Sequence, residues 1–144
     1  MGDLKIYDSK EISIIVGALI IDSGFADGEF LRIEPVSPDF VDKAGTDGEV
    51  TRTKTNDKRA KVTLRLMQSS DKNALLSVLN NIDRKASNGG GVGPFLVKDR
   101  QGTSLYAGAK CWISSPPVVS FDKEAKEREW VIMVASLERL DGGN

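Results

Sequence analysis

The 144-residue chain contains no histidine and only one cysteine. The lack of histidine removes the most common general base, the most common zinc ligand and the Ser-His-Asp triad together. A single cysteine cannot form a disulfide within the chain, which favours folding in a reducing cytoplasm. The composition therefore argues against an enzyme, and neither a cofactor nor a metal is predicted.

Net charge and long apolar runs are also missing. Twenty basic residues stand against 21 acidic ones, so the net charge of −1 gives no general attraction to nucleic acid or to anionic membranes. No apolar run reaches the ~18 residues that a transmembrane helix needs. Residues 1–5 lack the basic region and apolar stretch of a secretory signal. The length fits one domain, residues 1–144.

Alternation of apolar and polar residues with period 2 runs through much of the chain and predicts β-strands. The expected strands cover residues 11–16, 19–21, 29–34, 50–55, 60–66, 94–98, 105–113, 118–121 and 130–137. The last of these is apolar on both faces, which is typical of a strand between two layers or within an assembly. The pattern predicts a mainly β fold, an antiparallel β-sandwich or barrel.

One helix is predicted, over residues 71–86. Ser70 is the expected N-cap, and Asp71 suits the positive end of the helix dipole. One apolar stripe is expected to pack on the sheet, formed by Leu75, Val78, Leu79, Ile82 and Ala86. The glycines that follow Asn88 end the helix.

A long polar loop is expected between the third and fourth strands, at residues 39–49. Its glycines, aspartates and threonine offer little apolar surface. A loop of this length is uncommon in a compact domain unless it has a role. Contact with another subunit is the role that the sequence suggests.

Other candidates for chemistry are weak. Cys111 lies beside Trp112 in an apolar strand, which is typical of a buried packing residue. The carboxylates of Asp39, Asp42, Asp47 and Glu49 do not have the spacing of a calcium loop. The glycines of residues 89–93 follow a helix, whereas a phosphate loop precedes one.

A basic stretch could meet phosphates, but it has no interleaved aromatic residues for base stacking. It contains Arg52, Lys54, Lys58, Arg59, Lys61 and Arg65. A solvated strand face, or charge pairing between subunits, is the favoured interpretation. We expect Arg52, Lys54, Lys61 and Arg65 to meet carboxylates of neighbouring subunits or the outer surface.

Several segments together resemble a known family. They are Tyr7-Asp8-Ser9-Lys10, Gly24-Phe25-Ala26-Asp27-Gly28, Gly45-Thr46-Asp47-Gly48-Glu49-Val50-Thr51-Arg52-Thr53, Leu96-Val97-Lys98-Asp99, residues 109–117, Arg128-Glu129-Trp130-Val131 and Gly142-Gly143-Asn144. In this order the chain resembles the small tail tube proteins of bacteriophages with contractile tails, whose fold is shared with type VI secretion tube proteins. The resemblance covers nearly the whole length.

The resemblance implies hexameric rings that stack into a hollow tube inside a sheath. Assembly in the host cytoplasm and residence in the virion tail follow from it. The implied partners are further copies of the chain, the tail sheath protein, and baseplate and tail terminator proteins, while DNA passes through the lumen without specific binding.

The implied contact residues fall into two sets. The loop between rings would use Asp39, Asp42, Lys43, Thr46, Asp47 and Glu49. The sheet between subunits would use Val50, Arg52, Lys54, Val62, Leu64, Trp130, Ile132 and Val134.

Two alternatives stay open. A tail completion or baseplate hub protein would cap the tube without polymerising. A monomeric β-sandwich binding module for carbohydrate or protein belongs to another class. Such a module usually displays clustered aromatics, whereas this chain has two Trp, two Tyr and five Phe, mostly in apolar strands.

Overall fold

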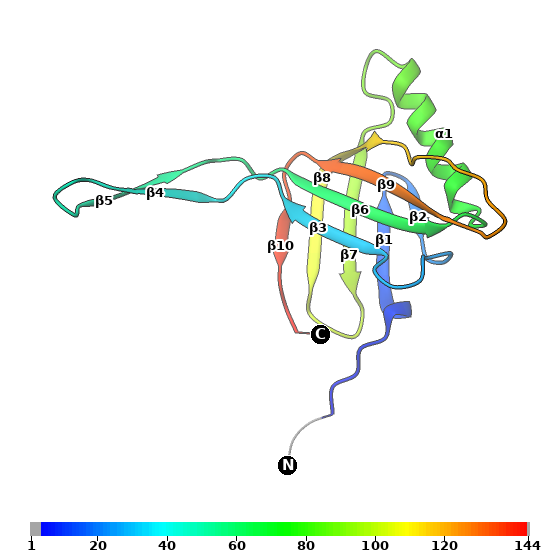
Figure 1. The fold of residues 1–144 in the computed structure, drawn as a ribbon, viewed down its shortest axis with the longest axis horizontal. Helices are drawn as coiled ribbons and strands as arrows, with labels where there is room; N and C mark the ends of the chain where they lie inside the picture. The colour runs from blue at the N-terminus through cyan, green and yellow to red at the C-terminus, as the bar shows by residue number, and fades with distance from the viewer. Residues whose placement is uncertain (1–3, 144) are drawn as a thin grey trace.

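The computed structural model describes residues 4–143 as a β-sheet body with one helix and one projecting hairpin (Figure 1). A short 3₁₀ turn, Ser9–Glu11, precedes the first strand. The elements are β1 (Ile12–Val16), β2 (Leu19–Ile21), β3 (Leu31–Pro35), β4 (Phe40–Ala44), β5 (Val50–Lys54), β6 (Ala60–Met67), α1 (Lys72–Lys85), β7 (Gly93–Asp99), β8 (Leu105–Ser115), β9 (Glu127–Val134) and β10 (Glu138–Leu140). The predicted mainly β, antiparallel fold with one helix is confirmed.

The body is one antiparallel sheet that folds over itself. Its strand order is β2-β1-β7-β8-β9-β6-β3, and β10 also pairs with β8. One edge of β8 is shared, because its second half pairs with β9 and its first half with β10. Figure 1 shows β3, β6 and β9 crossing over β1, β7 and β8, so the sheet forms two layers.

The chain bends between β9 and β10, and Gly108 of β8 permits the bend. A Cβ atom at Gly108 would lie 2.4 Å from Cγ1 of Val134 and 3.1 Å from the carbonyl oxygen of Ser136. A side chain there would push the two layers apart. Glycine at this position therefore allows the backbones to approach closely.

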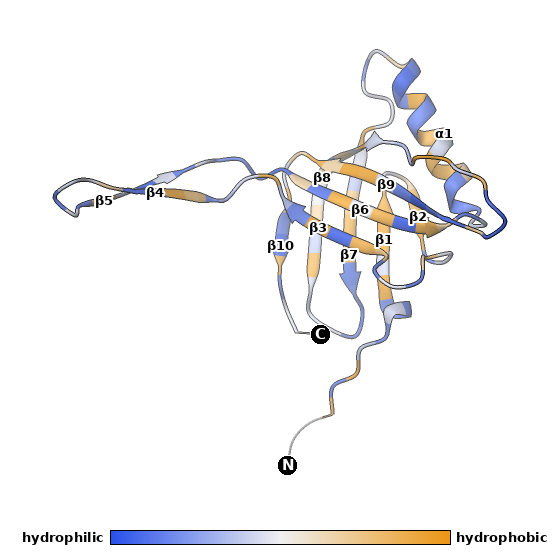
Figure 2. Ribbon diagram, in the orientation of Figure 1, coloured by the Kyte–Doolittle hydropathy of each residue, from blue (hydrophilic) through white to orange (hydrophobic). Residues whose placement is uncertain are grey.

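The core lies between the two layers. Alternate residues of β1 and β7 face it from one layer, and alternate residues of β6 and β9 from the other. Its fully or nearly fully buried members are Ile14, Val16, Ile21, Ala60, Val62, Leu64, Leu66, Leu76, Phe95, Val97, Cys111, Ile113, Trp130, Ile132 and Val134. Figure 2 shows the corresponding orange bands on the body strands.

The last predicted strand begins and ends three residues earlier than expected and is less buried. β9 ends at Val134, and the chain continues after the bend as β10, which the sequence did not predict. Trp130, Ile132 and Val134 are buried, whereas Val131 and Met133 on the other face are only half-buried. The predicted strand over residues 118–121 is wrong, because this segment contains no strand and its Val118 and Phe121 are 90% and 81% exposed.

Helix α1 packs on the body over a narrow contact. Leu76 is fully buried and Leu79 packs on the core, while Leu75, Val78 and Ile82 of the predicted stripe are between 42% and 58% exposed. The prediction that this stripe packs on the sheet is therefore wrong for three of its members. The main contacts of the helix are with β2 and β8, so the sheet covers too little of its surface to bury a wide stripe.

Side chains at the start of α1 fix its position. The indole N–H of Trp130 donates to Oδ1 of Asn73 at 2.9 Å, and Nδ2 of Asn73 donates to the carbonyl oxygen of Met67 at 2.9 Å. The predicted N-cap, Ser70, accepts a hydrogen bond from the backbone N–H of Lys72 at 3.2 Å. The cap position itself falls at Asp71, whose side chain forms no capping bond.

The predicted polar loop is present but more ordered than expected. Its first half is strand β4, which pairs with β5 from Phe40↔Lys54 to Ala44↔Val50, and only residues 45–49 turn the chain. Gly48 adopts a φ of 87°, and the carbonyl oxygen of Gly45 accepts from its N–H at 3.0 Å. We call the β4–β5 hairpin the arm. It projects away from the body at the left of Figure 1.

Candidate assembly surfaces

The arm has no buried residue. All ten residues of β4 and β5 are exposed. The alternation in residues 50–55 had predicted a strand with one buried face. Neither face is buried because the arm is a separate two-stranded sheet with nothing packed on either face. An isolated two-stranded hairpin is at best marginally stable in water. The arm therefore has surfaces to offer another molecule.

The strand register divides the arm into two faces. We call the first the charged face, because it combines Asp42, Arg52 and Lys54 with Phe40, Ala44 and Val50. The opposite face has Val41, Lys43, Thr51 and Thr53. On the charged face the guanidinium carbon of Arg52 lies 4.2 Å from the centre of the Phe40 ring, a cation–π contact. Figure 2 shows orange on part of β4, whereas much of the arm is pale or blue.

The residues predicted to contact the next ring lie along the arm. Asp39 precedes β4, Asp42 and Lys43 belong to it, and Thr46, Asp47 and Glu49 follow in the turn. Within the turn, the backbone N–H of Glu49 donates to Oδ1 of Asp47 at 3.1 Å. Asp47 therefore also shapes the turn that carries it.

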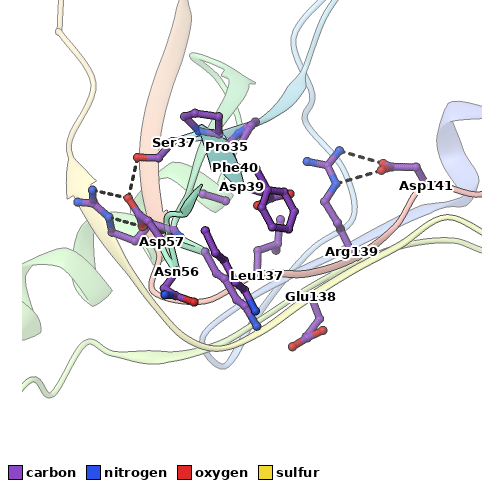
Figure 3. A pocket seen from close by; sticks show the side chains of 15 residues that line it. Pro35, Ser37, Asp39, Phe40, Asn56, Asp57, Leu137, Glu138, Arg139 and Asp141 are labelled. Carbon is purple, nitrogen blue, oxygen red and sulfur yellow. Dashed lines mark hydrogen bonds and ion pairs between the residues drawn. The ribbon is translucent and has the colours of Figure 1, made fainter. Parts of the chain in front are cut away.

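The root of the arm is built around Asp57, which follows the left-handed residue Asn56 (φ 58°). Oδ1 and Oδ2 of Asp57 each accept a hydrogen bond from the Arg59 guanidinium at 2.9 Å, and Oδ2 also accepts from the Ser37 hydroxyl at 2.8 Å (Figure 3). These bonds, Arg59's first, hold the pKa of Asp57 well below its usual value. The cluster ties the two chain segments that enter and leave the arm.

A second cluster lies on the other side of the root. Arg139 of β10 donates from Nε and Nη2 to Asp141 at 3.0 and 2.9 Å, and the Tyr106 hydroxyl donates to the same carboxylate at 2.7 Å. The bond to Asp141 raises the pKa of Tyr106, and the bond from Arg139 lowers that of Asp141. Figure 3 shows the Asp57 cluster and the Arg139–Asp141 pair beside a hollow of about 600 Å³ at the root of the arm.

Sequence reasoning missed this second cluster. Arg139 and Asp141 lie after the predicted end of the last strand, and Tyr106 is 35 residues away from Asp141 in the sequence. The alternation in Glu138-Arg139-Leu140 was the available signal for β10. It is too short to be distinguished from a turn.

The strands predicted to form a sheet between subunits are interior strands of the body. Val62, Leu64, Trp130, Ile132 and Val134 all face the core of their own chain. Their side chains are therefore already buried in the single chain, without a neighbouring subunit. The remaining predicted members, Val50, Arg52 and Lys54, lie on the charged face of the arm.

The outer face of β9, β6 and β3 carries mixed charges. Its cations are Arg32, Lys61 and Arg65, and its acids are Glu34, Glu127 and Glu129. Arg65 stands opposite Glu129 and Lys61 opposite Glu34 in the strand register. Basic and acidic residues thus alternate across this face.

Three strands of the body leave a backbone edge unpaired within residues 4–143. β2 and β3 end the strand order, and β10 pairs only with β8. Unpaired strand edges are templates for pairing with another chain. The edges and the arm are the two kinds of assembly surface that the fold provides.

Cys111 is a packing residue in the structure. It is 1% exposed, its Sγ lies 3.5 Å from the carbonyl oxygen of Pro94, and burial raises the pKa of its thiol. A raised pKa disfavours the reactive thiolate. Across residues 4–143, no three acidic or cysteine side chains come together in a way that could hold a metal ion. None of the helices in the described part of the chain is long and apolar enough to span a membrane.

Comparison with known proteins decides the family. Residues 23–142 match the family model of the bacteriophage PhiTE tail tube protein. The chain belongs to this tail tube family. It is 28% identical over 148 residues to structural protein ORF10 of Pseudomonas phage KPP10, covering 99% of this chain and 86% of that protein. The protein is therefore a structural component of a bacteriophage tail.

Solved structures share the fold at low sequence identity. The sheath/tube terminator of an extracellular contractile injection system, PVC, has a TM-score of 0.63 at 16% identity, over 96% of this chain and 99% of that one. A chain of the PVC sheath-tube complex has a TM-score of 0.59 at 12% identity, over 92% and 90%. This chain thus shares its fold both with a sheath/tube terminator and with a chain of a sheath-tube complex.

Proposed function

We propose that this tail tube family protein is the repeating subunit of a tail tube, in which hexameric rings stack into a hollow conduit for genome delivery inside a contractile sheath. The observation that carries the proposal is the arm, an ordered hairpin with no buried residue in the isolated chain. An ordered element that stabilises nothing in its own subunit suits contact with another copy.

The unpaired edges support ring closure. β2 and β10 are edges on opposite sides of one layer, and β3 is the edge of the other. A head-to-tail interface between two different surfaces of identical chains generates a ring when the rotation closes. Closing a sheet into a ring removes its edges from water.

The proposal extends to the passage of DNA. On the outer face of β9, β6 and β3, three cations are matched by three acids. Each Lys or Arg that neutralises a phosphate strengthens binding through counterion release, so a basic lumen would retain the genome. A face with alternating charges avoids this, and we expect open tubes to have no appreciable DNA affinity near physiological salt. A DNA-binding titration at several salt concentrations checks this, and tight salt-sensitive binding would contradict it.

A terminator is the second candidate, because the PVC sheath/tube terminator has the same fold. Sheath, baseplate and terminator proteins are the further partners that either role implies. Negative-stain electron microscopy of the purified wild-type protein distinguishes the roles. Long tubes or stacks of rings support the tube subunit, single rings favour the terminator, and monomers at high concentration contradict both.

A further inference from the structure

We infer that the body carries a socket for the arm of a second copy, and that Arg52 of the arm meets the buried carboxylate of Asp99 there. This inference rests on the proposed function and names the site that the arm would occupy. The socket is the cleft of about 450 Å³ lined by β3 of one layer and by β1, β7 and β8 of the other. Its lining includes Ile12 of β1, Leu31 and Ile33 of β3, Val97 and Asp99 of β7, and Tyr106 of β8.

The socket has an apolar wall, and its polar lining includes Glu29, Asp99, Ser104 and Arg139. Ile12, Leu31, Ile33 and Tyr106 are partly buried hydrophobic residues that pack on the core and border the cleft. A cleft of this volume is comparable to pockets that bind small ligands, so it suits a few side chains and not a whole strand. An occupant would therefore insert individual side chains.

Asp99 is the feature that specifies the occupant. It is 3% exposed, and its Oδ1 accepts a hydrogen bond from the backbone N–H of Gln101 at 3.0 Å. Its Oδ2 is buried and has no hydrogen-bond partner among residues 4–143. A buried carboxylate oxygen without a partner is costly, and an incoming cation would remove that cost.

The cation that borders the cleft in the same chain is already engaged. Arg139 binds Asp141 through two hydrogen bonds, as described above. Asp99 forms no ion pair with any residue of the described chain. The missing donor is therefore best supplied from another molecule.

The charged face of the arm has the complementary chemistry. Arg52 is exposed and forms no ion pair within residues 4–143, and its guanidinium rests on the Phe40 ring. Asp42 lies opposite Arg52 in the register, but the two do not form a salt bridge. Arg52 with Val50 and Phe40 combines a cation with apolar side chains, which matches the Asp99 carboxylate beside the apolar wall of the cleft.

The reach of the arm is sufficient for a contact outside its own body. Five residues of an extended strand span about 17 Å. Figure 1 shows the arm pointing away from the body, so the arm and the socket of one chain do not meet. The contact is intermolecular, and its occupant is a second copy of this chain.

Cross-linking between two variants tests the contact. In a Cys111→Ser background, Arg52→Cys in one preparation is mixed with Asp99→Cys or Ile33→Cys in another, assembled and treated with a short bismaleimide cross-linker. The spacer is needed because an extended arginine that meets a carboxylate holds the two Cα atoms farther apart than the about 7 Å that a disulfide allows. We expect at least roughly tenfold more linked dimer than with Thr53→Cys, which lies on the opposite face of the arm. Tubes that form without these links, or that link equally through Thr53→Cys, overturn the inference and leave the proposed function intact.

Asp99→Asn gives an independent readout. Because Asp99 has no cationic partner in the isolated chain, removing its charge is expected to leave the melting temperature of the monomer unchanged or higher, while tube yield falls and becomes less sensitive to salt. Asp141→Asn is the matched control, which should lower the melting temperature. Asp99→Asn with unchanged tube yield contradicts the inference. A wild-type protein that stays monomeric contradicts the proposed function itself, and the contact with it.

Discussion

The body and the arm use the same antiparallel pairing and differ in what covers them. In the body, alternate residues of β6 and β9 are buried between two layers, whereas every residue of β4 and β5 is exposed. The body carries its own stability in its core, and the arm depends on hydrogen bonds at its root. This difference separates folding from assembly, so changes in the two regions should have separable effects.

The largest effect on folding is expected from Trp130→Ala. Trp130 is 2% exposed and donates to Asn73, so its loss creates a cavity and leaves the half-buried Asn73 amide oxygen without its donor. We expect the free energy of unfolding to fall by about 3–5 kcal/mol, measured by urea denaturation. Met133→Ala on the half-buried face of the same strand is the control. Equal losses for the two variants would contradict the placement of the core.

A smaller effect is expected from Cys111→Ser. The substitution places a hydroxyl where the thiol packs between β7 and β8, and it should cost about 1–3 kcal/mol. Tube formation should persist, because Cys111 has no chemical role in this account. Denaturation and electron microscopy of the same sample check both points. A well-folded variant that no longer assembles would indicate a role for the thiol beyond packing.

Asp57→Asn should loosen the arm and leave the body unchanged. The amide cannot accept both guanidinium bonds, so hydrogen exchange in β4 and β5 should become faster while exchange in β6 and β9 stays the same. Since the folded-state pKa of Asp57 is lowered, its contribution is present above pH about 4 and is lost as the pH falls toward the lowered pKa. Protection from exchange in the wild-type arm, relative to the intrinsic rate at each pH, that does not fall on acidification would contradict this role.

The features that could be predicted from the sequence are those that depend on neighbouring residues, and not on contacts between distant segments of the chain. The strands of the body and the extent of α1 follow from local periodicity, which Val62, Leu64 and Ile132 show clearly. β4 escaped prediction because Asp42 and Lys43 read as loop residues, and only pairing with β5 makes them a strand. The alternation in β5 correctly indicated a strand but not a buried face, because burial depends on whether a second layer exists.

The candidate site was predictable in part for the same reason. The assembly role of residues 39–49 was suggested by their polarity, and it stays a proposal. The clusters around Asp57 and Asp141, and the buried oxygen of Asp99, arise from residues brought together by the fold. No local pattern in the sequence encodes such contacts.

The most direct test of the separation between folding and assembly is deletion of residues 44–48 from the arm. The deleted residues bury nothing in their own chain, so the free energy of unfolding should stay within about 0.5 kcal/mol of wild type. Electron microscopy and sedimentation of the same preparation should show folded subunits without long tubes, under conditions in which wild type assembles. Tubes as abundant as those of wild type would contradict the account, because the arm would then not be an assembly element.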